Sequence, residues 1–170
     1  MRLAGKVAII SGAASGMGAA TAHMFARAGA NVVIADVLEH EGRQVADAIG
    51  GSARFEPLDV TQEESWAAVV AATTGHFGKL DVLVNNAGIS GSAEQDFYST
   101  EAWHRIMAVN ATGVFFGIKH AISAMIANGG GPNACASFRC AGREKLTRWR
   151  TPFCSWLPMS RPTSQVRKST

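Results

Sequence analysis

A glycine-rich turn near the N-terminus is the first pattern in the chain that could do chemistry. It spans Gly12–Gly18 (GAASGMG), between a predicted strand and a predicted helix. Glycines permit a tight turn and let backbone N–H groups approach a pyrophosphate, while the helix N-terminus adds a favourable dipole. A flexible surface turn is the alternative interpretation. The strand before the turn and the helix after it favour phosphate binding.

An acidic residue follows at the end of the next predicted strand. Asp36 comes 18 residues after Gly18. A carboxylate there can accept hydrogen bonds from both ribose hydroxyls of an adenosine, and it would repel a 2′-phosphate. The sequence therefore predicts NAD as the cofactor and not NADP. The alternative is a surface acid that happens to lie near a strand end.

Polar residues also follow the next two predicted strands. Asp59 and Val60 come after the third strand, and Asn86, Ala87 and Gly88 come after the fourth. Ligands in open α/β sheets bind at the carboxyl ends of the strands. We therefore expect the residues at these strand ends to form one site.

Short apolar runs alternate with helical patterns along the first 130 residues. The expected strands are 6–11, 31–35, 53–58 and 81–85, and the expected helices are 17–28, 39–49, 61–74, 101–109 and 112–128. Thr61 and Glu64 fit a capping box with Thr61 as the N-cap. The alternation predicts an α/β fold, a Rossmann-type doubly wound parallel sheet that is incomplete, with about four strands.

The composition changes abruptly near residue 132. Residues 1–132 hold 8 basic and 12 acidic residues, whereas residues 133–170 hold 8 basic residues and one acidic residue. The tail has no clear helical or strand period, so we expect two parts: an NAD-binding Rossmann domain at 1–131 and a poorly ordered basic tail at 132–170. Without a fifth strand, 81–85 would be an exposed edge. Nucleic-acid binding by the tail is an alternative, but no recognised motif supports it.

Three motifs together resemble those of the short-chain dehydrogenase/reductase family. They are the Gly-x-x-x-Gly-x-Gly spacing of residues 12–18, the Asn-Asn-Ala-Gly of residues 85–88 and the Val-Asn-Ala-Thr-Gly of residues 109–113. The resemblance covers about residues 1–131. It is greatest to the NAD-preferring alcohol, sugar and hydroxysteroid dehydrogenases, which move hydride between a secondary alcohol or ketone and NAD.

The resemblance implies roles for particular residues. It assigns the pyrophosphate side to Gly12, Ser15, Gly16, Met17 and Gly18, the ribose to Asp36, the adenine to Asp59 and Val60, and the nicotinamide ribose to Asn86, Ala87 and Gly88. Asn110 would be the family's asparagine that positions a water in the proton relay.

The family's chemistry also needs a serine, a tyrosine and a lysine four residues after that tyrosine. Counting on from the glycines at 129–131 puts these three slots at Phe138, Thr151 and Ser155, and Tyr98 is the sole tyrosine of the chain. Losing positioned proton transfer costs about 10²- to 10⁴-fold in rate. We therefore expect an inactive chain of oxidoreductase lineage or, alternatively, a non-catalytic NAD-binding module. One hypothesis is that residues from about 132 are translated out of frame or come from an aberrant exon or gene model.

The remaining expectations concern location and partners. No run of about 18 apolar residues is present and the N-terminal apolar run is short, so we expect a cytoplasmic protein without a membrane partner. The three cysteines have no Cys-x-x-Cys spacing, so no metal site is expected. The family is usually homo-oligomeric, although the loss of sheet cover makes that doubtful in this chain.

Overall fold

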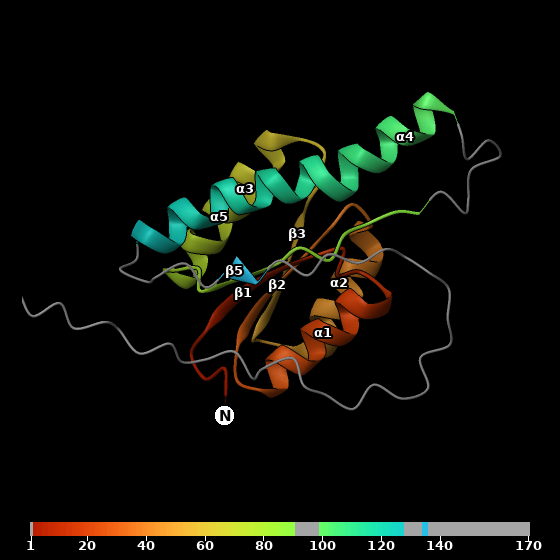
Figure 1. Ribbon diagram of the computed structural model, residues 1–170. Coiled ribbons are helices and arrows are strands. Elements are labelled where there is room, and N and C mark those ends of the chain that lie inside the picture. Colours follow the sequence, from red (N-terminus) through yellow and green to blue (C-terminus); the bar gives the residue numbers. More distant parts are fainter. Residues whose placement is uncertain (1, 91–98, 128–133, 136–170) are drawn as a thin grey trace, which may run out of the picture.

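The computed structural model describes residues 2–90, 99–127 and 134–135, which form a parallel sheet between two layers of helices (Figure 1). The strands are β1 (Val7–Ser11), β2 (Asn31–Asp36), β3 (Ala53–Pro57), β4 (Val82–Val84) and β5 (Ala134–Cys135). They pair in the order β3-β2-β1-β4-β5, and every pair is parallel. The α/β, doubly wound arrangement expected from the sequence is confirmed.

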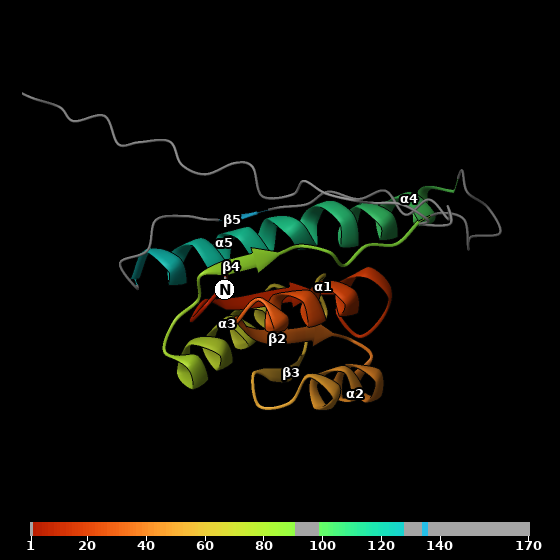
Figure 2. The same cartoon turned by 90° about the horizontal axis from the view of Figure 1, so that it is seen from below.

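Helices cover both faces of the sheet. They are α1 (Gly16–Arg27), α2 (Glu39–Ile49), α3 (Glu63–Phe77), α4 (Thr100–Met107) and α5 (Gly113–Ala127). Helices α1 and α2 pack on one face, and α3 and α5 lie on the other (Figures 1 and 2). Helices α1 and α2 each lead the chain to the neighbouring parallel strand, whereas α3 carries it from β3 past β2 and β1 to β4. Parallel strands need crossover connections of this kind.

The two central strands are apolar because both of their faces are covered. β1 is buried along its whole length, and four of the six β2 residues are buried. Successive side chains point to opposite faces, so Ile9 joins the core under α3 and α5 while Ile10 joins the core under α1 and α2. An apolar run without alternation is therefore the pattern that a central parallel strand should have.

The sheet has one strand more than we expected from the sequence. β5 is two residues long and pairs with β4 in the register Leu83 with Ala134 and Val84 with Cys135. The expectation that residues 81–85 form an exposed edge is therefore wrong for this part of β4. The segment was missed because a two-residue strand is too short to show a strand pattern. The rest of the tail lies outside the described residues.

Helices α4 and α5 form one continuous helical run. The two separate helices expected from the sequence are joined by a π-helical turn, Ala108–Thr112. By length and mean hydropathy alone the run from Thr100 to Ala127 could cross a membrane. Its buried residues include Val114, Ala121 and Met125, and the last two belong to the core beneath the sheet. One face of α5 therefore packs into the core, while Phe115 and Ile126 on the run are exposed.

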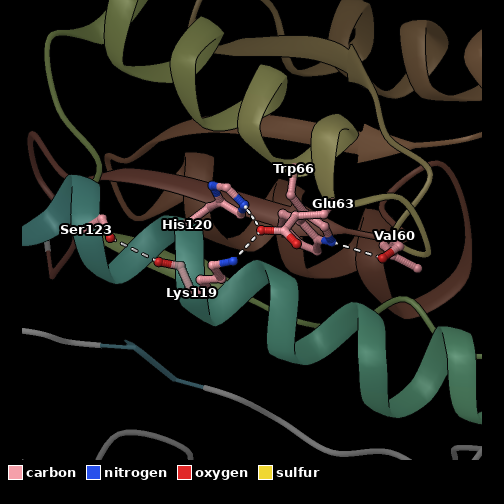
Figure 3. Close-up of polar contacts among 6 residues, drawn as sticks. All are labelled: Val60, Glu63, Trp66, Lys119, His120 and Ser123. Atoms are coloured by element: carbon pink, nitrogen blue, oxygen red, sulfur yellow. Dashed lines mark hydrogen bonds and ion pairs between the residues drawn. The ribbon is translucent and has the colours of Figure 1, made fainter.

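Three polar side chains tie α3 to α5 at the surface (Figure 3). Lys119 Nζ lies 2.5 Å and His120 Nε2 lies 3.2 Å from Glu63 Oε1. The hydrogen bond from Lys119 lowers the pKa of the Glu63 carboxyl below its ordinary value, and His120 acts in the same direction. Because Glu63 begins α3, its negative charge also lies at the positive end of the helix dipole.

Asp81 fixes the start of β4 against the start of β1. Its carboxylate accepts hydrogen bonds from Val7 N–H at 2.9 Å and Lys6 Nζ at 3.1 Å, and Lys79 Nζ lies 2.9 Å away. Burial raises the pKa of Asp81, but the hydrogen bonds from Lys79, Val7 and Lys6 outweigh it and lower the pKa below 3.8.

A depressed pKa in the folded state makes Asp81 stabilising above its unfolded-state pKa, and this stability is lost as the pH falls through the folded-state value. Asp81→Asn should therefore unfold at lower urea concentration than wild type at pH 7. The deficit should shrink below about pH 3.9, where the unfolded carboxyl becomes protonated. Urea unfolding at pH 7 and pH 3 measures this difference. An equal deficit at both pH values would contradict an ionic role for Asp81.

Candidate functional site

The predicted site residues meet at the carboxyl edge of the sheet. The register pairs Ser11 with Ala35, Ile10 with Val84 and Asp36 with Pro57. The segments that follow these strands therefore leave the sheet at the same edge. These segments carry most of the residues for which the sequence predicted cofactor contacts. Asp36 is the last residue of β2, and the remaining residues lie at the N-terminus of α1, which is at the same edge.

The glycine turn is folded so tightly that a side chain would not fit at Gly12 or at Gly18. Gly12 and Gly16 have φ angles of +66° and +54°, a backbone region that favours glycine. A Cβ on Gly12 would lie 2.7 Å from Ala87 Cα, and a Cβ on Gly18 would lie 2.1 Å from Gly12 O. The turn is therefore pressed against both α1 and the segment after β4.

The N-terminus of α1 faces outward beside this turn. Ser15 is the N-cap residue, but its side chain makes no capping hydrogen bond, and the first turn of α1 carries no acidic residue. Ser15, Gly16 and Met17 are exposed. No acidic side chain in the first turn of α1 neutralises the positive end of the helix dipole. Such an end suits an anion, for example a pyrophosphate.

Asp36 ties the end of β2 to the glycine turn. Its Oδ2 accepts a hydrogen bond from Ala14 N–H at 2.9 Å, and its Oδ1 accepts one from Leu38 N–H at 3.1 Å. Each carboxylate oxygen has two acceptor positions, so these bonds leave capacity for a ribose hydroxyl. The sequence predicted the ribose contact but not this second role in holding the turn.

Asn86 connects the segment after β4 to the turn after β1. Its Nδ2 donates to Ser11 O and to Gly12 O, both at 3.0 Å. In return, Ser11 Oγ accepts hydrogen bonds from Asn86 N–H at 3.1 Å and Ala87 N–H at 3.2 Å. The Asn86 side chain therefore supports the glycine turn. Gly88, two residues later, is exposed at the same edge.

Ser11 has a role in holding the site together that the sequence interpretation did not assign to it. It is buried, with 1% of its surface exposed, and its hydroxyl accepts the two N–H groups that begin the Asn86–Gly88 segment. A polar residue at the end of an otherwise apolar strand, directly before the glycine turn, was the available signal.

Asp59 folds back on its own loop. Its Oδ1 accepts hydrogen bonds from Thr61 N–H at 2.9 Å and Thr61 Oγ1 at 2.7 Å. The capping box predicted for Thr61 is therefore wrong, since Gln62 is the N-cap residue of α3 and the Thr61 hydroxyl is bonded to Asp59. An aspartate two residues before a threonine offered a competing local hydrogen bond.

Asn110 lies in the π-helical turn and holds the segment after Gly88. Its Oδ1 accepts from Ile89 N–H at 2.9 Å, and its Nδ2 donates to Ile89 O at 2.8 Å. Single π-turns inside α-helices occur frequently at functional sites. The side chain that the sequence assigned to a proton relay thus clamps the loop beside the predicted nicotinamide position.

Asn85 has a buried amide without a partner. The residue is 4% exposed, and among the residues described neither its Oδ1 nor its Nδ2 makes a hydrogen bond. Leaving a buried polar group unsatisfied costs about 1–3 kcal/mol. An apolar side chain would be more stabilising than the Asn85 amide at this position, which directly precedes the Asn86–Gly88 segment.

These features fit a dinucleotide. The glycine turn offers a cradle that a Cβ would fill, the N-terminus of α1 faces it, and a carboxylate ends the neighbouring strand. In the part of the chain that the structure covers, no group of three or more His, Cys, Asp or Glu side chains could hold a metal ion. Such an arrangement defines the class of Rossmann-type nucleotide-binding folds.

Comparison with known proteins identifies the family within that class. The family model described as short chain dehydrogenase matches residues 6–132. The chain therefore belongs to the short-chain dehydrogenase/reductase family, as its motifs suggested.

The chain is similar to several dehydrogenases. It is 49% identical to trans-4-hydroxycyclohexanecarboxylate dehydrogenase of Sinomonas cyclohexanicum, over 76% of this chain and 53% of that protein. It is 46% identical to a 3-alpha-(or 20-beta)-hydroxysteroid dehydrogenase of Mycobacterium tuberculosis, over 73% and 48%. It is 42% identical to a mitochondrial borneol dehydrogenase of Lavandula x intermedia, over 76% and 50%. The chain spans about half the length of the curated relatives it matches.

Proposed function

We propose that this chain binds NAD at the carboxyl edge of its sheet as the cofactor-binding part of a short-chain oxidoreductase. The observation that carries the proposal is the glycine cradle, where Gly18 has no room for a Cβ and Asp36 holds the turn through Ala14 N–H. Residues 12–18 would hold the pyrophosphate, and Asp36 the adenosine ribose. Asp59 and Val60 would contact the adenine, and Asn86–Gly88 the nicotinamide ribose. When bound, NAD supplies a hydride acceptor, and NADH a donor.

By its lineage, we propose, the chain descends from enzymes that transfer hydride between a secondary alcohol or ketone and NAD. The relatives are named for hydroxyl-bearing substrates, namely trans-4-hydroxycyclohexanecarboxylate and 3-alpha- or 20-beta-hydroxysteroids. In this chain, Asn110 would hold the loop beside the nicotinamide through Ile89. The 170-residue chain itself should bind NAD without turning it over, because its sole tyrosine, Tyr98, has no lysine four residues later. A chain of this sequence that oxidised trans-4-hydroxycyclohexanecarboxylate with NAD would contradict that part.

Asp36→Ala tests the proposed cofactor contact. Charged hydrogen bonds contribute about 1.5–3 kcal/mol, so the affinity for NAD should fall about tenfold or more. The affinity for NADP should fall less, because the repulsion between Asp36 and a 2′-phosphate is lost as well. Calorimetric titration with both nucleotides gives the ratio of the two affinities.

The ratio separates the two roles of Asp36. If Asp36→Ala acted only by losing the hydrogen bond to Ala14 and loosening the turn, NAD and NADP would both bind more weakly by the same factor, and the ratio of affinities would stay unchanged. Loss of the ribose contact would change that ratio. Asp47→Ala is the matched control, since Asp47 is an exposed carboxylate on α2 and its removal should leave both affinities as in wild type. An unchanged ratio in Asp36→Ala would remove Asp36 from cofactor selection.

A further inference from the structure

Trp66 is the largest fully buried side chain of the described residues, and it lies behind the loop that follows β3. Its indole Nε1–H donates a hydrogen bond to Val60 O at 3.2 Å (Figure 3). Val60 is one of the two residues proposed to contact the adenine. An apolar ring such as that of phenylalanine could fill part of the space under the loop, but it has no donor for this carbonyl.

Helix α5 presses on the same carbonyl and on the same ring. A Cβ on Gly113 would lie 2.9 Å from Val60 O, and a Cβ on Gly117 would lie 2.8 Å from Trp66 Cη2. Contacts below 3.0 Å require something to shift, so the backbone of α5 leaves the ring and the carbonyl no free space on that side. Trp66 therefore cannot tilt without moving either α5 or Val60.

The same contact reaches the segment after β4. A Cβ on Gly117 would lie 2.7 Å from Asn85 Oδ1, and Asn85 directly precedes the Asn86–Gly88 segment. One spot on α5 thus touches both the Trp66 ring and the residue before the proposed nicotinamide loop. The spacing between the two loops is set by a packed ring and a helix backbone, both of which are rigid.

The other hydrogen bonds of the loop centre on Asp59, whose Oδ1 accepts from Thr61 N–H and Thr61 Oγ1. Asp59 N–H donates to Ser65 Oγ at 3.1 Å, and Gln62 N–H donates to Asp59 O at 3.1 Å. The Val60 carbonyl takes part in none of these bonds, and it accepts its hydrogen bond from the indole. Removing that donor would leave a carbonyl without its partner in a dry environment, and the loop would shift to recover one.

We propose that Trp66 is a positioning residue for cofactor binding. It fixes the position of the Asp59–Val60 loop relative to the adenine. This inference rests on the proposed function, because it needs Val60 to contact the nucleotide. It predicts that the adenine half of the cofactor, and not the nicotinamide half, depends on the indole N–H.

Trp66→Phe tests the inference in the full chain, because it removes the N–H and keeps an aromatic ring. Ligand-observed NMR titrations with ADP and with nicotinamide mononucleotide measure the two halves separately. ADP should bind about tenfold more weakly, the equivalent of about 1.4 kcal/mol, and nicotinamide mononucleotide should bind as to wild type. Gly113→Ala pushes the same carbonyl from the side of α5 and should give the same split, which covers the case in which Trp66→Phe does not fold.

Thr73→Val is the matched control on the same helix. Thr73 is fully buried, and its Oγ1 donates to Val69 O at 2.7 Å, so this variant also loses a buried hydrogen bond of α3. It should melt at a lower temperature and bind ADP as wild type does.

Two results would overturn the positioning role while leaving the proposed function intact. One is ADP affinity in Trp66→Phe equal to that of wild type, and the other is an equal loss of both half-ligands. Wild-type protein that is folded but binds neither ADP nor NAD would overturn the proposed function and this inference together.

Discussion

Gly18→Ala, which adds a single methyl group, is expected to abolish measurable NAD binding. This is the largest effect on NAD binding that we expect from any substitution. The added Cβ would lie 2.1 Å from Gly12 O and 2.8 Å from Ala13 Cα, and both are backbone atoms that cannot swing aside. Overpacking of this kind costs about 1–3 kcal/mol of stability. The turn must open to relieve it, and the cradle for the pyrophosphate opens with it. Calorimetric titration with NAD, together with thermal melting, measures both effects.

The control for Gly18→Ala is Gly75→Ala. Gly75 lies in α3, and a Cβ there would meet no atom within 4 Å. Replacing glycine by alanine in an open helical position stabilises by about 1 kcal/mol, so this variant should melt higher and bind NAD as wild type does. NAD affinity in Gly18→Ala within twofold of wild type would show that the close packing of the turn is not needed for binding.

Asn86→Ala is expected to have the second-largest effect, on stability first and on NAD binding through it. The variant removes the amide that donates to Ser11 O and Gly12 O, so two carbonyls at the end of β1 lose a partner. Each buried unsatisfied group costs about 1–3 kcal/mol, which is a large part of the stability of an ordinary domain. We expect a much lower urea midpoint and NAD binding weakened at least tenfold.

Gln44→Ala provides the comparison for Asn86→Ala. Gln44 Nε2 lies 3.1 Å from His40 Nε2 at an exposed position on α2. Water replaces such a contact, so the urea midpoint should stay within error of wild type. If Asn86→Ala unfolded at the same urea concentration as Gln44→Ala, the clamp between β1 and β4 would not hold the site together.

The strand ends that carry the candidate residues could be predicted from the sequence because strand ends are set by local patterns. Four apolar runs predict four parallel strands, and this pattern alone places Gly12, Asp36, Asp59 and Asn86 at one edge of the sheet, where the register brings them. The direction of each side chain depends on contacts between segments far apart in the chain. Asn86 bonds residues 74 and 75 positions earlier, and no local pattern specifies such a contact.

The differences in the elements also have physical reasons. Thr61 was expected to cap α3, but the Asp59 carboxylate accepts hydrogen bonds from both the N–H and the hydroxyl of Thr61. Residues 110–111 were expected to separate two helices, but the π-turn Ala108–Thr112 accommodates them within one helical run. Asn110, in that turn, reaches Ile89 with both ends of its amide. These contacts again join distant segments.

The proposed cofactor site and the positions expected for the catalytic residues lie on opposite sides of the point where the similarity to the family ends. Residues 6–132 match the family model, and they hold every residue of the proposed cofactor site. The slots predicted for the serine, tyrosine and lysine (Phe138, Thr151 and Ser155) lie outside the described residues. Cofactor binding and turnover are therefore separate properties of this chain and need separate assays.

Hydrogen exchange of the full chain with and without saturating NAD tests the central claim most directly. We expect slower exchange in four segments of one edge, namely residues 12–18, 36–38, 59–62 and 85–89, and little change in the exposed face of α2. A folded chain in which saturating NAD left those four segments unchanged, or protected a different part of the sheet, would contradict it.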